Sequence, residues 1–246
     1  MNPANGVQDM ISEKTHPQER IFRANRLRII IMIILALSPS VSMINAGNKL
    51  LLGLFLSVCM AWLLLSFSKL KWSDVGLKKF KGRKRFILTV TIILVSIILF
   101  SWGLRHLVTF LLKSEPNLEA FKALKGDPGA LMTGLVIAWF FGAFCEEMLF
   151  RGFLLNAFYG LFGDNLNSTA RWVFSLLIVS TLTGLGHAYQ GITGMIVAGA
   201  IGFCFGLVYL YNNRNLWPSI LTHGIYDTIA FVIVFLGFNL DQVLKF

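Results

Sequence analysis

The sequence predicts an all-α membrane protein, a polytopic transmembrane helical bundle of about seven spans around a buried polar cavity. Hydrophobic residues make up 56% of the 246 residues and charged residues only 14%, and the mean hydropathy is +0.70. Apolar runs recur along the chain, and a helix needs about 20 such residues to cross a bilayer. These values exclude a soluble globular domain.

The expected spans follow the apolar runs in chain order, at about residues 27–44, 50–67, 86–112, 130–159, 172–187, 191–211 and 216–238. The first run also has features of a secretory signal peptide, but the long polar segment before it favours an uncleaved span. Very short turns join the last three runs, so we expect these spans to pack as antiparallel neighbours. Small residues in the sixth run favour close helix packing.

Positive charge is concentrated beside the apolar runs, and the formal net charge is +10. Segment 69–85 holds eight lysines and arginines against the single Asp74. The positive-inside rule places this loop and the N-terminal tail in the cytoplasm. Anionic lipids are the expected partners of loop 69–85, and nucleic acid is not an expected partner.

We divide the chain into a cytoplasmic tail at 1–26, N-terminal spans at 27–128, a transmembrane core at 129–238 and a C-terminal tail at 239–246.

Two adjacent acids, Glu146 and Glu147, and the cation Arg151 interrupt the apolar run of the fourth span. A charge near the bilayer centre costs roughly 3 kcal/mol or more, so it persists only where it is paired, lines water or takes part in chemistry. On an α-helix, Glu147 and Arg151 lie one turn apart in the favourable order for a structural ion pair. Glu146 points about 100° away, which makes it the candidate general base. Alternatively, both acids only bind neighbouring helices.

Two histidines in later apolar runs, His187 and His223, complete the set of candidate site residues together with Asp227, which shares a helix face with His223 at i, i+4. A lone buried histidine is more often simply hydrogen-bonded, but two histidines with several acids favour a hydrolytic site. Two mechanisms remain open. His187, His223 and Glu146 could hold a divalent metal such as zinc with an open water position, or the residues could activate water directly. The soluble zinc motif HExxH is absent. We expect the glycines around His187 to break or tilt its helix, so that it reaches a shared cavity.

The three cysteines, Cys59, Cys145 and Cys204, lie in apolar runs without a CxxC motif. We interpret them as small buried hydrophobic residues. Cys145 adjoins Glu146, but nothing near it in the sequence would activate a thiol nucleophile.

These ordered motifs resemble the CPBP family of intramembrane proteases, the CAAX proteases and bacteriocin-processing proteins, also called the Abi family. The family motifs EExxxR, FxxxH and HxxxN or HxxxD correspond here to Glu146-Glu147 with Arg151, to His187, and to His223 with Asp227. The resemblance covers about residues 70–238, including the segment Trp72-Ser73-Asp74-Val75-Gly76-Leu77, and its core is about 130–230. Thr183 stands where the family has phenylalanine, a departure expected to affect substrate selection more than activity.

The resemblance implies an endopeptidase that hydrolyses a peptide bond in a membrane-associated substrate, prenylated or bacteriocin-like. It implies that Glu146 activates water, that His187 and His223 position the water or stabilise the oxyanion, and that Asp227 orients His223. The candidate catalytic residues are therefore Glu146, Glu147, His187, His223 and Asp227. The family is commonly called a metalloprotease, and a metal-free glutamate–histidine mechanism has also been proposed for it, so zinc remains an alternative.

Two other functions are compatible with buried acids. A non-catalytic membrane scaffold or bacteriocin self-immunity protein would retain the fold without the chemistry. A proton-coupled transporter would be expected to show an internal repeat, and the sequence shows none. The short outer loops favour a multi-pass protein of a bacterial cell membrane with a cytoplasmic N-terminus, and a eukaryotic endoplasmic reticulum membrane is the alternative.

Overall fold

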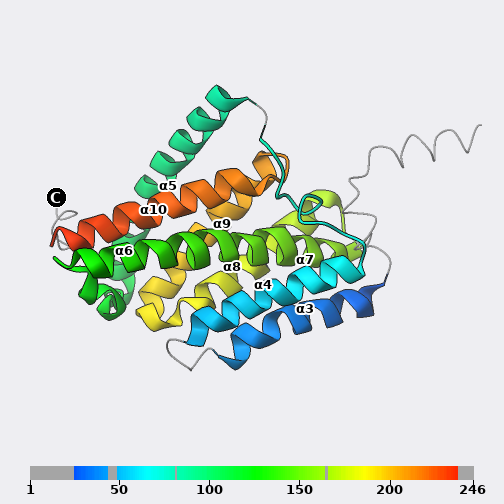
Figure 1. The fold of residues 1–246 in the computed structure, drawn as a ribbon, viewed down its shortest axis with the longest axis horizontal. Helices are drawn as coiled ribbons and strands as arrows, with labels where there is room; N and C mark the ends of the chain where they lie inside the picture. Colours follow the sequence, from blue (N-terminus) through cyan, green and yellow to red (C-terminus); the bar gives the residue numbers. More distant parts are fainter. Residues whose placement is uncertain (1–24, 44–48, 81, 164–165, 238–246) are drawn as a thin grey trace, which may run out of the picture.

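The computed structural model describes residues 25–43, 49–80, 82–163 and 166–237, and every regular element within these ranges is helical (Figure 1). The all-α prediction is confirmed. The predictions for residues 1–24 and for the C-terminal tail at 239–246 lie outside the described residues. The elements are α3 (Arg26–Ser42), α4 (Lys49–Phe67), α5 (Arg83–Leu112), η1 (Glu119–Leu124), α6 (Pro128–Ile137), η2 (Ala138–Leu154), α7 (Leu155–Phe162), α8 (Ser168–Gly186), η4 (Ala188–Gln190), α9 (Gly191–Tyr211) and α10 (Leu216–Phe235).

Six helices of the described chain are long and apolar enough to cross a membrane, close to the expected seven. They are α4, α5 from Phe86, the continuous helix α6–η2–α7, α8, α9 with the preceding turn, and α10. The expected first span forms as α3, but it has 17 residues and is therefore only about 25 Å long. That length is at the lower limit for a hydrocarbon core of about 30 Å.

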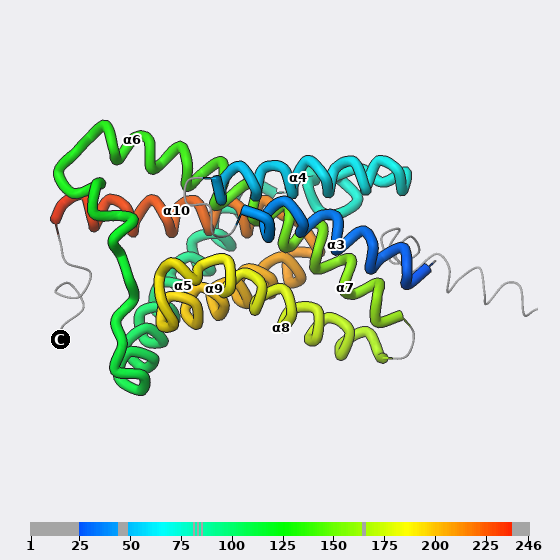
Figure 2. Tube along the Cα trace, turned by 90° about the horizontal axis from the view of Figure 1, so that it is seen from below, coloured from blue at the N-terminus to red at the C-terminus, as the bar shows by residue number. Residues whose placement is uncertain are grey.

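The continuous helix α6–η2–α7 lies at the centre of the arrangement (Figure 1). It has 35 residues, and its η2 part contacts α10 on one side and α4 on the other. Helix α3 packs on α4, and α8 packs on both α7 and α9. Helix α5 crosses the other helices steeply in both views and contacts α9 and α10 (Figures 1 and 2). The central helix and these neighbours enclose the polar residues singled out by the sequence.

The middle of the central helix is a π-helix, with backbone hydrogen bonds from each residue to the fifth along, over Ala138–Leu154. The sequence analysis places Glu147 and Arg151 on an ordinary α-helix, so the π-helix is a difference from the prediction. A π-helix places more residues in each turn, so neighbouring side chains diverge by less than the 100° of an α-helix, and such segments are frequent at functional sites. As a result, the adjacent Glu146 and Glu147 both face the region of His223.

The segment before α5 packs against the turn between α9 and α10. The Tyr209 hydroxyl donates to the Val75 carbonyl at 2.9 Å, and the Leu216 amide donates to the Gly76 carbonyl at 2.9 Å. Gly76 has a φ of +118°, and a Cβ there would lie 2.6 Å from the Arg214 carbonyl oxygen. Only glycine fits this position without displacement. Burial, and then the nearby Arg214, lower the pKa of Lys78 at the end of this segment.

Candidate active site

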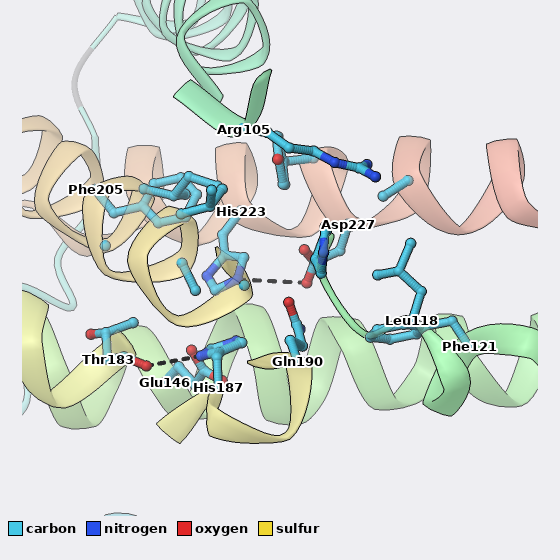
Figure 3. A pocket seen from close by; sticks show the side chains of 18 of the residues that line it. Arg105, Leu118, Phe121, Glu146, Thr183, His187, Gln190, Phe205, His223 and Asp227 are labelled. Atoms are coloured by element: carbon cyan, nitrogen blue, oxygen red, sulfur yellow. Dashed lines mark hydrogen bonds and ion pairs between the residues drawn. The ribbon is translucent and has the colours of Figure 1, made fainter. Parts of the chain in front are cut away.

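A cavity of about 210 Å³ brings most of the predicted site residues together (Figure 3). Glu146 enters it from η2, His187 from the end of α8, and His223 and Asp227 from α10. Glu147 does not line the cavity; it lies behind it, fully buried, and contacts His223. Five candidates from three separate segments of the sequence therefore form one cluster at a buried polar cavity.

Glu147 is the centre of a buried network. Its Oε1 lies 3.1 Å from Nη1 of Arg151 and accepts a hydrogen bond from Nδ1 of His223 at 3.0 Å. Arg151 also donates through Nη2 to the carbonyl of Gly202 on α9 at 2.7 Å. Buried charges need such partners because their desolvation is expensive. The sequence predicted only the pair with Arg151, whereas Glu147 also orients His223.

The second ring nitrogen of His223 faces Asp227. Nε2 lies 3.5 Å from Oδ2 of Asp227, one helical turn further along α10. The shorter contact of the ring is thus with Glu147, since Nδ1 is 3.0 Å from Oε1. Because Glu147 holds Nδ1–H, Nε2 is the ring nitrogen that faces Asp227 and the cavity.

His187 caps the C-terminus of α8. Its Nδ1 lies 2.9 Å from the carbonyl oxygen of Thr183. Because a carbonyl only accepts, Nδ1 carries the proton and Nε2 is left as an acceptor. The glycines around His187 predict a broken or tilted helix that brings His187 to a shared cavity; α8 ends at Gly186, and Gly191, with a φ of +75°, begins α9. The helix end itself brings His187 to the cavity.

Glu146 is half-buried, and its carboxylate belongs to the cavity lining. Its Oε2 is buried and has no hydrogen-bond partner among the described residues. The Oε2 of Glu147 is in the same situation, but that residue does not line the cavity. A buried carboxylate oxygen without a partner is costly. Glu146 is therefore the cavity-lining carboxylate whose hydrogen-bonding capacity the described residues leave partly unused.

The predicted metal ligands His187, His223 and Glu146 do not form a metal-binding group in this structure. Within residues 25–43, 49–80, 82–163 and 166–237, no cluster of three or more His, Cys, Asp and Glu side chains is placed to hold a metal ion. At His223, both ring nitrogens face carboxylate oxygens, so this ring offers no free nitrogen to a metal ion. We derive no step through a metal.

Three further polar residues line the cavity that the sequence analysis did not select: Gln190, Arg105 and Tyr226. Gln190 follows His187 in the turn η4, and its amide donates to the hydroxyl of Tyr189 at 3.0 Å. Arg105 lies inside the apolar run of α5. A cation at that depth is itself a signal of function, and it could have been found from the sequence.

Comparison with protein-family models shows which known family the central part of the chain resembles. Residues 128–229 match the family described as Type II CAAX prenyl endopeptidase Rce1-like. This matched segment, less than half of the chain, is similar to a CAAX protease domain. The resemblance found from the motifs is thereby confirmed, and with the apolar helices it makes the protein an integral, multi-pass membrane protein. Comparisons with curated proteins and with solved structures found no match.

The matched segment does not supply the whole cavity. Its matched residues include all five candidate catalytic side chains. Arg105 of α5 and the loop and turn residues Pro116, Leu118 and Phe121 come from before the match, and part of α10 follows it. The cavity wall is therefore shared between the matched segment and its flanking segments.

Proposed function

We propose that the protein is an intramembrane endopeptidase that hydrolyses a peptide bond of a membrane-associated substrate with water activated by Glu146. The observation that carries this proposal is the cavity-facing carboxylate of Glu146, with its unpartnered Oε2, beside His187, His223 and Asp227. A general base, two imidazoles and a buried acid network are the parts that hydrolysis by water requires. The family match supports the same reaction class.

In the proposed mechanism, Glu146 removes a proton from water as the water oxygen attacks the peptide carbonyl. His187 offers Nε2 to orient that water, because its Nδ1 is held by Thr183. His223, fixed through Nδ1 by Glu147, donates from Nε2 to the oxyanion when protonated, and Asp227 stabilises its charge. The C–N bond then breaks as Glu146 passes its proton to the leaving nitrogen.

The substrate class follows from the position of the cavity among apolar helices. A peptide or protein held at the membrane reaches it more readily than a dissolved one. The name of the matched family, a prenyl endopeptidase, supports a lipid-modified substrate, and a bacteriocin-like peptide is the alternative.

We also propose that the protein lies in a bacterial cell membrane with its N-terminus in the cytoplasm. The basic residues of loop 69–85 support this orientation and a contact of the loop with anionic lipids.

The test compares membrane peptidomes of cells that express the wild type or Glu146→Gln at equal level. Gln keeps the size of the side chain but cannot take a proton, so we expect specific product peptides to disappear and uncut precursors to accumulate. Glu119→Gln is the matched control, because Glu119 is a 67% exposed acid paired with Lys122 at the surface. Matching peptidomes, with a cellular phenotype that survives Glu146→Gln, would instead favour the scaffold or self-immunity function.

A further inference from the structure

Gln190 enters the cavity from the turn η4, three residues after His187, and the proposed mechanism assigns it no role. Figure 3 shows its side chain directed from that turn toward Asp227. The carboxamide of a glutamine is uncharged and carries two N–H donors and one acceptor oxygen. A neutral hydrogen-bond donor therefore lies beside the candidate catalytic residues.

The surroundings of Gln190 hold it in place from three segments of the chain. Its backbone amide donates to the His187 carbonyl at 2.9 Å, and its carbonyl accepts from the Asn117 amide at 2.8 Å. On α9, a Cβ at Gly194 would overlap with Cβ of Gln190 and lie 3.1 Å from its Oε1. Glycine at that position therefore leaves room for the glutamine side chain. A donor that acts in catalysis needs such a fixed position.

The carboxamide of Gln190 makes one hydrogen bond among the described residues, from Nε2 to the hydroxyl of Tyr189 at 3.0 Å. Because the nitrogen carries two hydrogens, the second N–H is left for another acceptor. The Tyr189 hydroxyl can also donate, so it would hold Oε1 equally well after a half-turn of the carboxamide. In either orientation, at least one N–H has no acceptor among the described residues.

Several other donors of the cavity lining are already engaged. The hydroxyl of Thr183 donates to a carbonyl of its own helix at 3.0 Å, and the hydroxyl of Tyr226 donates to Oγ of Ser101 on α5 at 3.1 Å. The guanidinium of Arg151 is paired with Glu147. A bound peptide would have to displace these partners, whereas Gln190 has an N–H to offer without a displacement.

His223 can donate to an oxyanion only when its ring is protonated. Its Nδ1–H is held by Glu147 at 3.0 Å, so Nε2 carries no proton in the neutral ring. The amide hydrogens of Gln190 are permanent. Because Glu146 and Asp227 would repel a developing negative charge, an oxyanion in this cavity needs a donor that is present throughout the reaction.

We propose that Gln190 is a further catalytic residue, whose N–H donates to the carbonyl oxygen of the peptide bond that is cut. As the water oxygen bonds to the carbonyl carbon and Glu146 takes the water proton, the C=O π electrons move to this oxygen. The hydrogen bond from Gln190 strengthens with that charge. When the C–N bond breaks, the electrons return to the carbonyl. The inference rests on the proposed peptidase function.

The test compares oxygen with sulfur at the carbonyl that is cut. Full-length protein in detergent micelles is given a peptide library with randomised apolar residues, and mass spectrometry of the products identifies the bond cut in the best substrate. That peptide is made again as the thioamide at this bond, because sulfur is a weak acceptor. The thio ratio is kcat/KM of the oxygen peptide divided by that of the sulfur peptide. Both are measured on one preparation, so partial misfolding cancels from the ratio.

Gln190→Met keeps the length of the side chain without its donor, and the thio ratio should fall about 10-fold or more, as the loss of a hydrogen bond to a charged group implies. For the oxygen peptide, kcat should fall about 100-fold with little change in KM. Gln190→Ala should lower the thio ratio equally and serves where Gln190→Met does not fold, whereas Gln190→Asn should keep part of it. Asn212→Leu is the matched control, because Asn212 is a half-buried carboxamide that caps the other end of α9 and does not line the cavity.

The outcomes separate the inference from the proposed function. A thio ratio in Gln190→Met or Gln190→Ala equal to that of the wild type overturns the inference, while cleavage that depends on Glu146 upholds the peptidase. A wild type that cuts no peptide of the library, or cuts no faster than Glu146→Gln does, overturns both.

Discussion

Nδ1 of His223 lies 3.0 Å from Oε1 of Glu147, closer than Nε2 of the same ring lies to Oδ2 of Asp227, at 3.5 Å. The second glutamate of the pair is therefore both the partner of Arg151 and the main support of the histidine. One buried side chain therefore has both a structural role, the ion pair with Arg151, and a chemical role, the orientation of His223.

Glu147→Gln should weaken both roles. The variant leaves Arg151 buried without its counter-charge, and breaking a buried pair costs about 3–5 kcal/mol of stability. Thermal unfolding in detergent should show a clear loss for Glu147→Gln and a smaller one for Asp227→Asn, because the 24% exposed Asp227 side chain is less buried than Glu147. Equal losses in the two variants would contradict the central position of Glu147.

Gly202→Ala should disturb the same network from the side of α9. A Cβ at Gly202 would lie 3.0 Å from Cγ2 of Thr183 and 3.1 Å from Nη2 of Arg151. Overpacking of this kind costs about 1–3 kcal/mol and should also lower peptide hydrolysis. Gly103→Ala in α5 is the control, since nothing lies within 4 Å of a Cβ there. If both variants unfold at the same temperature as the wild type, the close packing at Gly202 does not contribute to stability.

Tyr209→Phe tests the contact between the segment before α5 and the core. Tyr209 is fully buried; its hydroxyl donates to the Val75 carbonyl and accepts from the amide of Asn156 at 2.9 Å. Removing it takes this donor from the buried Val75 carbonyl and one of three acceptors from the Asn156 amide, which costs about 1–3 kcal/mol. Calorimetric unfolding should show this loss, whereas Tyr211→Phe, at an 82% exposed position, should be neutral. Unaltered unfolding of Tyr209→Phe would refute the role of this hydrogen bond.

Chelation tests whether peptide hydrolysis at this site depends on a metal ion. Since His187, His223 and Glu146 do not form a metal-binding group, we expect peptide hydrolysis to survive incubation with a strong zinc chelator. Hydrolysis rates before and after chelation, and the metal content of the purified protein, provide the measurement. Activity that disappears with the chelator and returns with added zinc would show that the ligands rearrange to bind metal.

The position of the site could be predicted from the sequence because charge in an apolar run is conspicuous. Glu146, Glu147, His187, His223 and Asp227 were selected on that ground, and the structure brings them together. The contact between Glu147 and His223 could not be predicted, because it joins residues 76 positions apart on different helices. It also depends on a π-helix, which has no simple sequence pattern.

The membrane class, the order of the helices and the candidate catalytic residues can be inferred from the amino-acid sequence, because hydropathy and charge act locally along the chain. The partner of each side chain depends on how the helices pack in three dimensions. The crossing of α5 over α9 and α10 brings Arg105 to the cavity, and the end of α8 brings His187 there. These are outcomes of helix packing, where the orientation of each helix depends on side-chain fit with its neighbours and not on its own composition.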